Sequence, residues 1–302
     1  MTIRNLDVVG KRNYFLGFSG TLVAISIALV MVLGLKPGID LEGGTQWQVA
    51  FQKNGVTPQE IVSAVQGTDI GNKDVTVTQG NDGTFTLRMH TLSEAEHQTL
   101  VQALNQKIGT VDEKNYSSIG PSVGAALRTN AIWAIAVVLI GISLYIAYAF
   151  RKVSEPVKSW KYGVVTLLTL VHDVSIPTGL LAILGVTSGI EIDTNFIVAL
   201  LVVMGFSVHD TIVVFDRIRE NLLLQRGKKA ALGEIINYSV RETFARSVNT
   251  SFTLFLVLIA LLFLGPSSLF YFILTILVGT IFGTYSSIFV ASPLLYMWQR
   301  KQ

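Results

Sequence analysis

Residues 195–215 read NFIVALLVVMGFSVHDTIVVF, and this run is long and apolar enough to cross a lipid bilayer as a helix. Its ionisable residues are His209 and Asp210, which are adjacent in the sequence. Five further apolar runs of span length lie at residues 14–35, 129–150, 162–186, 244–264 and 269–298. The sequence therefore predicts an α-helical polytopic membrane protein with six transmembrane helices.

The composition supports this fold class and excludes several others. Of the 302 residues, 50% are hydrophobic and only 14% are charged, whereas soluble domains carry about 25% charged residues. An ordinary soluble enzyme and a disordered chain are thereby excluded. The sequence contains no cysteine, which excludes disulfide scaffolds, thiolate metal sites and cysteine nucleophiles. The net charge of +3 is small, and the sequence suggests no nucleic-acid partner.

Lysine and arginine are distributed unevenly between the loops. They occur in residues 1–13, in the loops after the second and fourth apolar runs, and in the tail at 299–302, whereas the loops after the third and fifth runs contain none. By the positive-inside rule, both termini are predicted to be cytoplasmic, and residues 36–127 are predicted to form a periplasmic or extracellular domain. Because the first run is too long for a signal-peptide core, we expect it to remain as an anchor. Residues 128–298 then form a five-helix transmembrane bundle.

The segment at 36–127 has the pattern of a small α+β domain. Thr57 and Ser93 each precede a Glu by three residues, which is the capping-box signature of a helix start. Alternating apolar residues predict strands at residues 45–52, 74–78, 84–89 and, less regularly, 115–119. The order β-α-β-β-α-β is typical of a ferredoxin-like unit. We find no catalytic cluster in it and do not expect an enzyme. His90 and His97 are expected to lie on its surface.

The third and fourth apolar runs each contain the tripeptide Val-His-Asp. Asp173 follows His172 in one, and Asp210 follows His209 in the other. A charged side chain near the bilayer centre costs on the order of 3 kcal/mol, so such residues need a partner or a water-filled cavity. Arg246 lies at the inner end of the fifth run, at a depth comparable to that of Asp210.

An ion pair between Asp210 and Arg246 would keep the local net charge near zero, and a proton on Asp210 would release Arg246. These residues therefore predict a proton relay that drives a conformational switch. The alternative is that the buried polar residues pair statically and hold the helices together. For Asp173 and His172 both interpretations stay open. Asp216 lies beside Arg217 and Arg219 at the membrane edge, and we expect an interfacial salt bridge there.

Other chemistries fit the residues less well. An intramembrane aspartyl protease would need Gly-x-Gly-Asp, and residues 206–210 read FSVHD instead. Metal ligands on a helix are favoured at spacings of three or four residues, whereas His and Asp are adjacent here, so we expect neither a metal nor a cofactor. Gly279 and Gly283, four residues apart in the sixth run, predict close helix packing. A passive scaffold that only binds partners is the main rival to the relay.

Residues 205–221, GFSVHDTIVVFDRIREN, resemble the fourth-span signature of the SecF group in the SecD/SecF family of protein-export membrane proteins. The resemblance gives Asp216, Arg217 and Arg219 the role of motif residues, together with Gly43 and Gly44 of a motif after the first span. Further stretches that resemble the family, and that extend the resemblance over nearly the whole chain, are residues 38–45, 119–124, 171–174, 246–251 and 286–291.

The chain departs from the family pattern at a few positions. The family usually has Tyr and Asn where Phe206 and His209 stand, and Phe where Leu41 stands. The Asp-Leu-x-Gly-Gly form of the first motif is closer to the sister subunit SecD, but the segment at 36–127 is too small for the outer domain of SecD. His209 is the departure with consequences, because a titratable ring replaces an amide beside Asp210.

The resemblance implies a subunit of the SecD–SecF complex in the cell inner (plasma) membrane. Its implied partners are SecD, the SecYEG channel, in some cases YajC, and the unfolded polypeptide in transit. Members of this family are similar to resistance-nodulation-division transporters in their six-span unit, and are thought to use the proton motive force to pull polypeptide outward after SecA has acted. The positions matched to proton coupling are Asp210 and Arg246. The alternatives are a passive assembly factor of the translocon and a subunit of a proton-driven small-molecule exporter.

Overall fold

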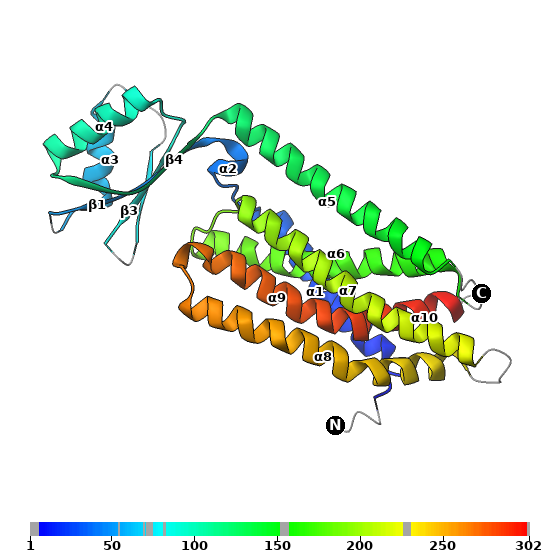
Figure 1. Cartoon of the computed structure of the whole chain (residues 1–302). Helices are drawn as coiled ribbons and strands as arrows, with labels where there is room; N and C mark the ends of the chain where they lie inside the picture. Colours follow the sequence, from blue (N-terminus) through cyan, green and yellow to red (C-terminus); the bar gives the residue numbers. More distant parts are fainter. Residues whose placement is uncertain are drawn as a thin grey trace. The chain divides into compact units, whose positions relative to one another are not determined.

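The computed structural model describes residues 6–53, 55–68, 70, 75–80, 83–151, 157–225 and 231–300. The chain divides into two compact units (Figure 1). Residues 37–132 form an α+β unit, and residues 1–36 together with 133–302 form a helical unit.

Within the described residues, six helices are long and apolar enough to cross a membrane. The last of them changes from α-helix to a short π-helical segment and back. Their bounds are α1 (Arg12–Leu33), α5 (Pro121–Ala149), α6 (Ser159–Thr187), α7 (Thr194–Leu224), α8 (Leu232–Leu264) and the sequence α9 (Phe270–Ser286), η3 (Ser287–Ala291) and α10 (Ser292–Arg300), which the short turn η2 (Ser267–Leu269) precedes. The predicted six-helix class is confirmed.

Helices α6, α7 and α9 form the centre of the helical unit. Helix α7 packs against α6, α8 and α9, while α9 also contacts α6 and α8, and α1 packs on α6 (Figure 1). The interior is closely packed around side chains such as Tyr162, Met204, Phe215 and Ile218, all of which are buried. Helices α1, α5 and α8 bury only a minor part of their surface within this chain.

Two glycines bring α9 close to α7. A Cβ atom placed on Gly279 would lie 2.3 Å from Cγ2 of Val203, and one on Gly283 would lie 3.2 Å from Cβ of Ser207. Small residues allow two helices to approach until their backbones nearly touch. The predicted packing role of Gly279 and Gly283 is therefore confirmed, and it sets the distance between α7 and α9.

The N-terminal residues before α1 are bound to the first turns of α8. The backbone amides of Val8 and Val9 both donate to Oδ1 of Asn237 at 3.0 Å, and Nδ2 of Asn237 donates to Oδ1 of Asp7 at 2.7 Å. Val8 and Val9 are buried in the main core of the helical unit. This segment therefore ties the start of α1 to α8, a contact that the sequence analysis did not predict.

The α+β unit has the predicted ferredoxin-like topology. Its sheet is antiparallel with the strand order β2-β3-β1-β4, and Trp47, Leu87, Ile61 and Leu100 are fully buried in its core. Both long helices begin with the predicted capping boxes. The elements are α2 (Ile39–Glu42), β1 (Gly44–Phe51), α3 (Pro58–Gln66), β2 (Thr76–Gln79), β3 (Phe85–Met89), α4 (Glu94–Lys107) and β4 (Val111–Ile119).

The motif glycine Gly43 packs against the start of α5 within the α+β unit. Its φ angle is +84°, and a Cβ atom on it would lie 2.8 Å from Cα of Pro121. A Cβ atom on Gly124 would lie 2.6 Å from the backbone N of Gly43. A left-handed φ and this close contact both exclude a side chain at position 43. The two motifs at 38–45 and 119–124 are thus parts of one tightly packed junction.

The expectation that His97 lies on the surface is wrong. Its side chain is buried, its Nε2 lies 2.9 Å from Oε2 of Glu113, and its ring stacks on that of Tyr116. Burial also raises the pKa of Tyr116. The signal was present in the sequence, because His97 precedes Leu100 by three residues and Leu104 by seven and therefore shares their buried face. His90 is half-buried rather than fully exposed.

Candidate functional site

Two carboxylates are buried near the middle of the helical unit. Asp173 lies halfway along α6 and has no exposed surface, and Asp210 lies near the middle of α7 with 5% of its surface exposed. Most of the residues around them in the middle of these two helices are apolar. Both carboxylates therefore depend on the few polar side chains that the neighbouring helices supply.

Asp173 is held by hydrogen bonds from three helices. The ring of His172 on α6 contacts it through Nδ1, 2.8 Å from Oδ1. Ser207 of α7 and Ser286 of α9 both donate to Oδ2, the second at 2.8 Å. The other ring nitrogen of His172 is buried and has no hydrogen-bond partner among the described residues. Asp173 thus joins α6, α7 and α9 through one carboxylate.

Asp210 has serine hydroxyls around it and no histidine ring bonded to it among the described residues. Ser287, the first residue of η3, donates a hydrogen bond to its Oδ2. The hydroxyl of Ser247 on α8 is buried and faces the same carboxylate. Among the described residues, the carboxylate of Asp210 therefore contacts serine hydroxyls from η3 and α8 and forms no ion pair.

Adjacent serines in the last span serve the two carboxylates. Ser286 ends α9 and donates to Asp173, while Ser287 begins η3 and donates to Asp210. A π-helical segment is rare and is frequent at functional sites, because it shifts the hydrogen-bond register of a helix by one residue. Residues 286–291 resemble a family motif, but no role for these two hydroxyls was predicted from the sequence.

The expected ion pair between Asp210 and Arg246 is absent from the described residues. Asp210 bonds to Ser287, whereas Arg246 has an exposed side chain. The ion pair is absent because Arg246 lies on a side of α8 that does not face Asp210. Ser247 is the residue of α8 that faces Asp210, and its neighbour Arg246 points about 100° away around the helix. His209 is exposed on α7 for the same reason.

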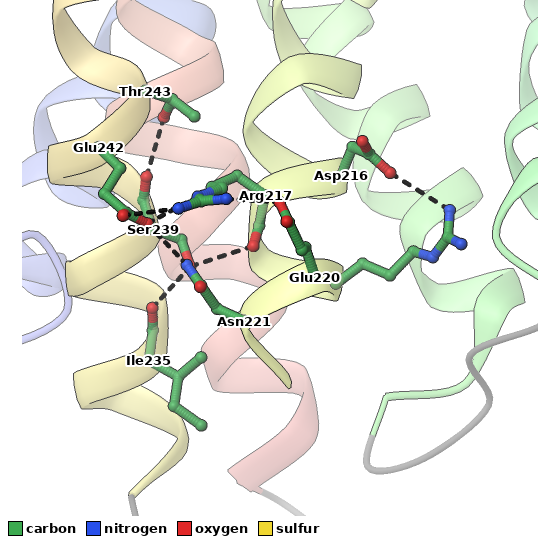
Figure 2. A network of polar contacts seen from close by, with 9 residues as sticks. Asp216, Arg217, Glu220, Asn221, Ile235, Ser239, Glu242 and Thr243 are labelled. Atoms are coloured by element: carbon green, nitrogen blue, oxygen red, sulfur yellow. Dashed lines mark hydrogen bonds and ion pairs between the residues drawn. The ribbon is translucent and has the colours of Figure 1, made fainter. Parts of the chain in front are cut away.

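The remaining motif residues form an ion-pair network at the end of α7 (Figure 2). Arg217 contacts Glu242 of α8 through both Nε and Nη2 at 2.6 Å, in a bidentate arrangement, and contacts Glu220 at 2.5 Å. Asp216 pairs with Arg219 at 3.2 Å. The salt bridge expected of Asp216 is thus present.

Glu242 and Asn221 belong to the same network, and their contacts were not predicted from the sequence. Asn221 donates from Nδ2 to Ser239 and to Glu242, both at 2.9 Å, which adds a second link between α7 and α8. Figure 2 shows Arg217, Asn221 and Glu242 converging between the two helices. The end of the stretch at 205–221 therefore links α7 to α8 through Arg217 and Asn221, two to three helical turns away from Asp210. Over the described residues, no group of three His, Asp or Glu side chains could hold a metal ion.

Comparison with known proteins places this arrangement in a family. Residues 99–301 match the family described as protein export membrane protein SecD/SecF, C-terminal. The protein translocase subunit SecF of Thermobaculum terrenum is 41% identical over 310 residues, which cover 98% of this chain and 95% of that protein. SecF of Anaerolinea thermophila is 34% identical over 297 residues, which cover 97% of this chain and 94% of that protein.

A solved structure has the same fold. The crystal structure of SecDF from Thermus thermophilus, described as a translocon-associated membrane protein, superposes with a TM-score of 0.82 at 33% identity. The match covers 99% of this chain and 40% of the SecDF chain, so this chain spans about two fifths of that protein. The resemblance drawn from residues 205–221 is confirmed by these matches.

Proposed function

The chain belongs to the SecD/SecF family of protein-export membrane proteins, and we propose that it assists protein translocation by coupling proton binding at Asp210 to movement of its helices. Its relatives are named as protein translocase subunits, which supports a role in protein translocation. In the proposed cycle, a proton from the outer side of the membrane reaches Asp210, changes the packing around it, and leaves toward the cytoplasm.

One observation carries the proposal: Asp210 is buried within the helical unit, and among the described residues the groups that contact its carboxylate are serine hydroxyls rather than a cation. An unpaired charge at this depth costs several kcal/mol, and proton binding removes that charge. The two protonation states of Asp210 therefore differ greatly in how they interact with the surrounding helices. A group with this property is suited to converting proton movement into a change in helix packing.

The other relay residues surround this centre. Asp173 with His172 forms a buried acid–imidazole pair, which we propose as a further place for a proton. His209 and Arg246 are exposed on α7 and α8 in the isolated chain. We propose that they face the proton path where a partner subunit covers these helices. In that assembled state, Arg246 balances the charge of Asp210 from a distance. It does not form the direct bond that a static ion pair would have.

The proposed partners follow from the relatives. In the Thermus thermophilus protein, SecD and SecF regions are joined in one chain, and this chain aligns with about two fifths of it. We therefore propose a complex with SecD that acts beside the SecYEG channel on unfolded polypeptide, with YajC as a further partner. We place it in the inner (plasma) membrane with both termini in the cytoplasm.

A passive scaffold is the second candidate, and the geometry around Asp173 favours it. Both oxygens of this carboxylate have hydrogen-bond partners within the chain, as in a static helix clamp. In a scaffold, replacing either buried carboxylate by an amide would leave the activity intact, provided that the helices stay packed.

The experiment that tests the proposal compares two carboxylates on α7. Asp210→Asn removes the buried titratable group, and the matched control Asp216→Asn removes an exposed one that pairs with Arg219. Each variant replaces the native protein in the source cell, and secretory precursor is followed by pulse-chase together with the membrane levels of the variant and of SecD. We expect slow export at normal levels for Asp210→Asn and near-normal export for the control. Normal export by Asp210→Asn at normal levels would refute the relay.

A further inference from the structure

We propose that Ser286 and Ser287 are positioning residues that link the two buried carboxylates, so that a proton bound at Asp210 is felt at Asp173. The inference rests on the proposed function, because it concerns how the same site responds to a proton. It starts from two consecutive residues of the last span, Ser286 and Ser287, whose hydroxyls are bonded to different carboxylates.

Each serine has two acceptors within reach and only one proton to donate. Ser286 lies 2.8 Å from Oδ2 of Asp173 and 3.0 Å from the carbonyl oxygen of Gly283. Ser287 contacts Oδ2 of Asp210 and lies 2.9 Å from the carbonyl oxygen of Thr284. A hydroxyl has one donor hydrogen and two acceptor lone pairs. The choice between carboxylate and carbonyl therefore depends on which acceptor is stronger.

Protonation of Asp210 reverses this choice. While the carboxylate is charged, it is the stronger acceptor and takes the hydroxyl proton of Ser287. Once the carboxyl carries a proton, its own O–H donates to Oγ of Ser287. The serine hydrogen then turns to the carbonyl of Thr284. No proton is lost or gained in this rearrangement beyond the one that Asp210 binds.

The backbone carbonyl that receives the hydrogen lies where the helix changes register. Thr284 is in the last turn of α9, and η3 begins at Ser287. Hydrogen bonds from serine to carbonyls one turn earlier compete with the backbone ladder and bend helices. The new bond therefore alters the junction between α9 and η3. Ser286 is part of that junction, so its bond to Asp173 changes with it.

Close packing makes such a small change effective. At Gly279 and Gly283, α9 packs directly against side chains of α7, so the two helices have little free space between them. Ser207 itself donates to Asp173, so α7 and α9 meet at that carboxylate. A bend at the junction is therefore passed to α6 and α7 together. Packed elements respond to such shifts by changing between discrete arrangements.

The chain offers a matched control on the same span. Ser292 begins α10, is fully buried, and has a hydroxyl with no hydrogen-bond partner among the described residues. Ser292→Ala removes a buried hydroxyl of equal size without touching either carboxylate. Ser287→Thr keeps the hydroxyl of Ser287 and so tests rescue by chemistry rather than by volume.

The test uses infrared difference spectroscopy of the full-length chain, purified with its SecD partner in lipid nanodiscs, as the pH is changed. Asp210→Asn identifies the carbonyl band of the protonated Asp210 carboxyl. We expect Ser287→Ala to raise the frequency of this band, because the acid loses its acceptor, and to move its pH midpoint by about one unit, the effect of one hydrogen bond to a charged acceptor. Ser287→Thr should restore both values, and Ser292→Ala should leave them unchanged.

The link between the carboxylates is tested by Ser286→Ala, which touches Asp173 but not Asp210. We expect this variant also to move the midpoint of the Asp210 band. An unchanged Asp210 band in either Ser286→Ala or Ser287→Ala would overturn the inference while leaving the proposed function intact. If no band disappears in Asp210→Asn and export by that variant is normal, the proposed function itself fails.

Discussion

Replacing Gly279 by alanine tests how much the site depends on the close approach of α7 and α9. The new Cβ would lie 2.3 Å from Cγ2 of Val203, whereas carbon atoms in contact sit about 3.5–4.0 Å apart. The helices must therefore separate locally by roughly 1.2–1.7 Å, or Val203 must leave its rotamer. Val203 is fully buried and β-branched, so its side chain has little freedom to turn.

The energetic consequence follows from two opposing effects. Overpacking of this kind costs about 1–3 kcal/mol, and the better helix propensity of alanine returns up to about 1 kcal/mol. We expect a net loss of stability for Gly279→Ala. At Gly283 the new Cβ would lie 3.2 Å from Cβ of Ser207, so the neighbour must yield by only a few tenths of an ångström. Gly283→Ala is therefore expected to be close to neutral.

Gly205 supplies the control. It lies on α7, and a Cβ atom on it would have nothing within 4 Å. Thermal unfolding of the purified variants, followed by circular dichroism in the same detergent, should rank them with Gly205→Ala at or above the wild type, Gly283→Ala near it, and Gly279→Ala below it. Export by Gly279→Ala should also fall, because separation of α9 from α7 draws Ser287 away from Asp210. A melting temperature for Gly279→Ala equal to that of Gly205→Ala would refute the packing argument.

Three further predictions concern other parts of the chain. Asn237→Ala leaves two buried backbone amides of the N-terminal segment, including that of Val8, without their acceptor; we expect a loss of about 1–3 kcal/mol, visible as faster hydrogen exchange of that segment, and protection equal to wild type would contradict it. Glu242→Gln weakens the bidentate contact with Arg217. In low salt the variant should melt at a lower temperature than the wild type, and the difference should shrink in high salt, because salt screens the partly exposed ion pair of the wild type. A difference independent of salt would point to packing instead. Gly43→Ala places a side chain at a left-handed φ of +84° and against the start of α5. We expect faster proteolysis of the α+β unit. Resistance equal to wild type would count against the close packing of Gly43 on α5.

The sequence was sufficient for the fold class because its signals are local. Span-length apolar runs, capping boxes at Thr57 and Ser93, and the alternating strands of the α+β unit each depend on residues close together in the chain. The glycine pair at 279 and 283 was equally readable. His97 was misjudged, although its spacing to Leu100 and Leu104 was available to the same kind of argument.

The partners of the carboxylates were not predictable in the same way. Apolar residues occur on every side of α6, α7 and α9, so the hydrophobic pattern does not fix which side of each helix faces the interior. A choice between Arg246 and Ser247 as the neighbour of Asp210 depends on a rotation of about 100°. The contact of the N-terminal segment with Asn237 joins residues more than 220 positions apart, and no local signal in the sequence marks such a pair.

The most direct test of whether proton binding at Asp210 drives the assistance to export is translocation into inverted membrane vesicles with and without an imposed proton gradient. The vesicles contain the wild-type chain, Asp210→Asn or Asp216→Asn at equal levels, and the amount of precursor protected from protease is measured over time. We predict that the gradient accelerates export in the wild type and in Asp216→Asn, and has little effect in Asp210→Asn. Full stimulation by the gradient in Asp210→Asn vesicles would contradict the account.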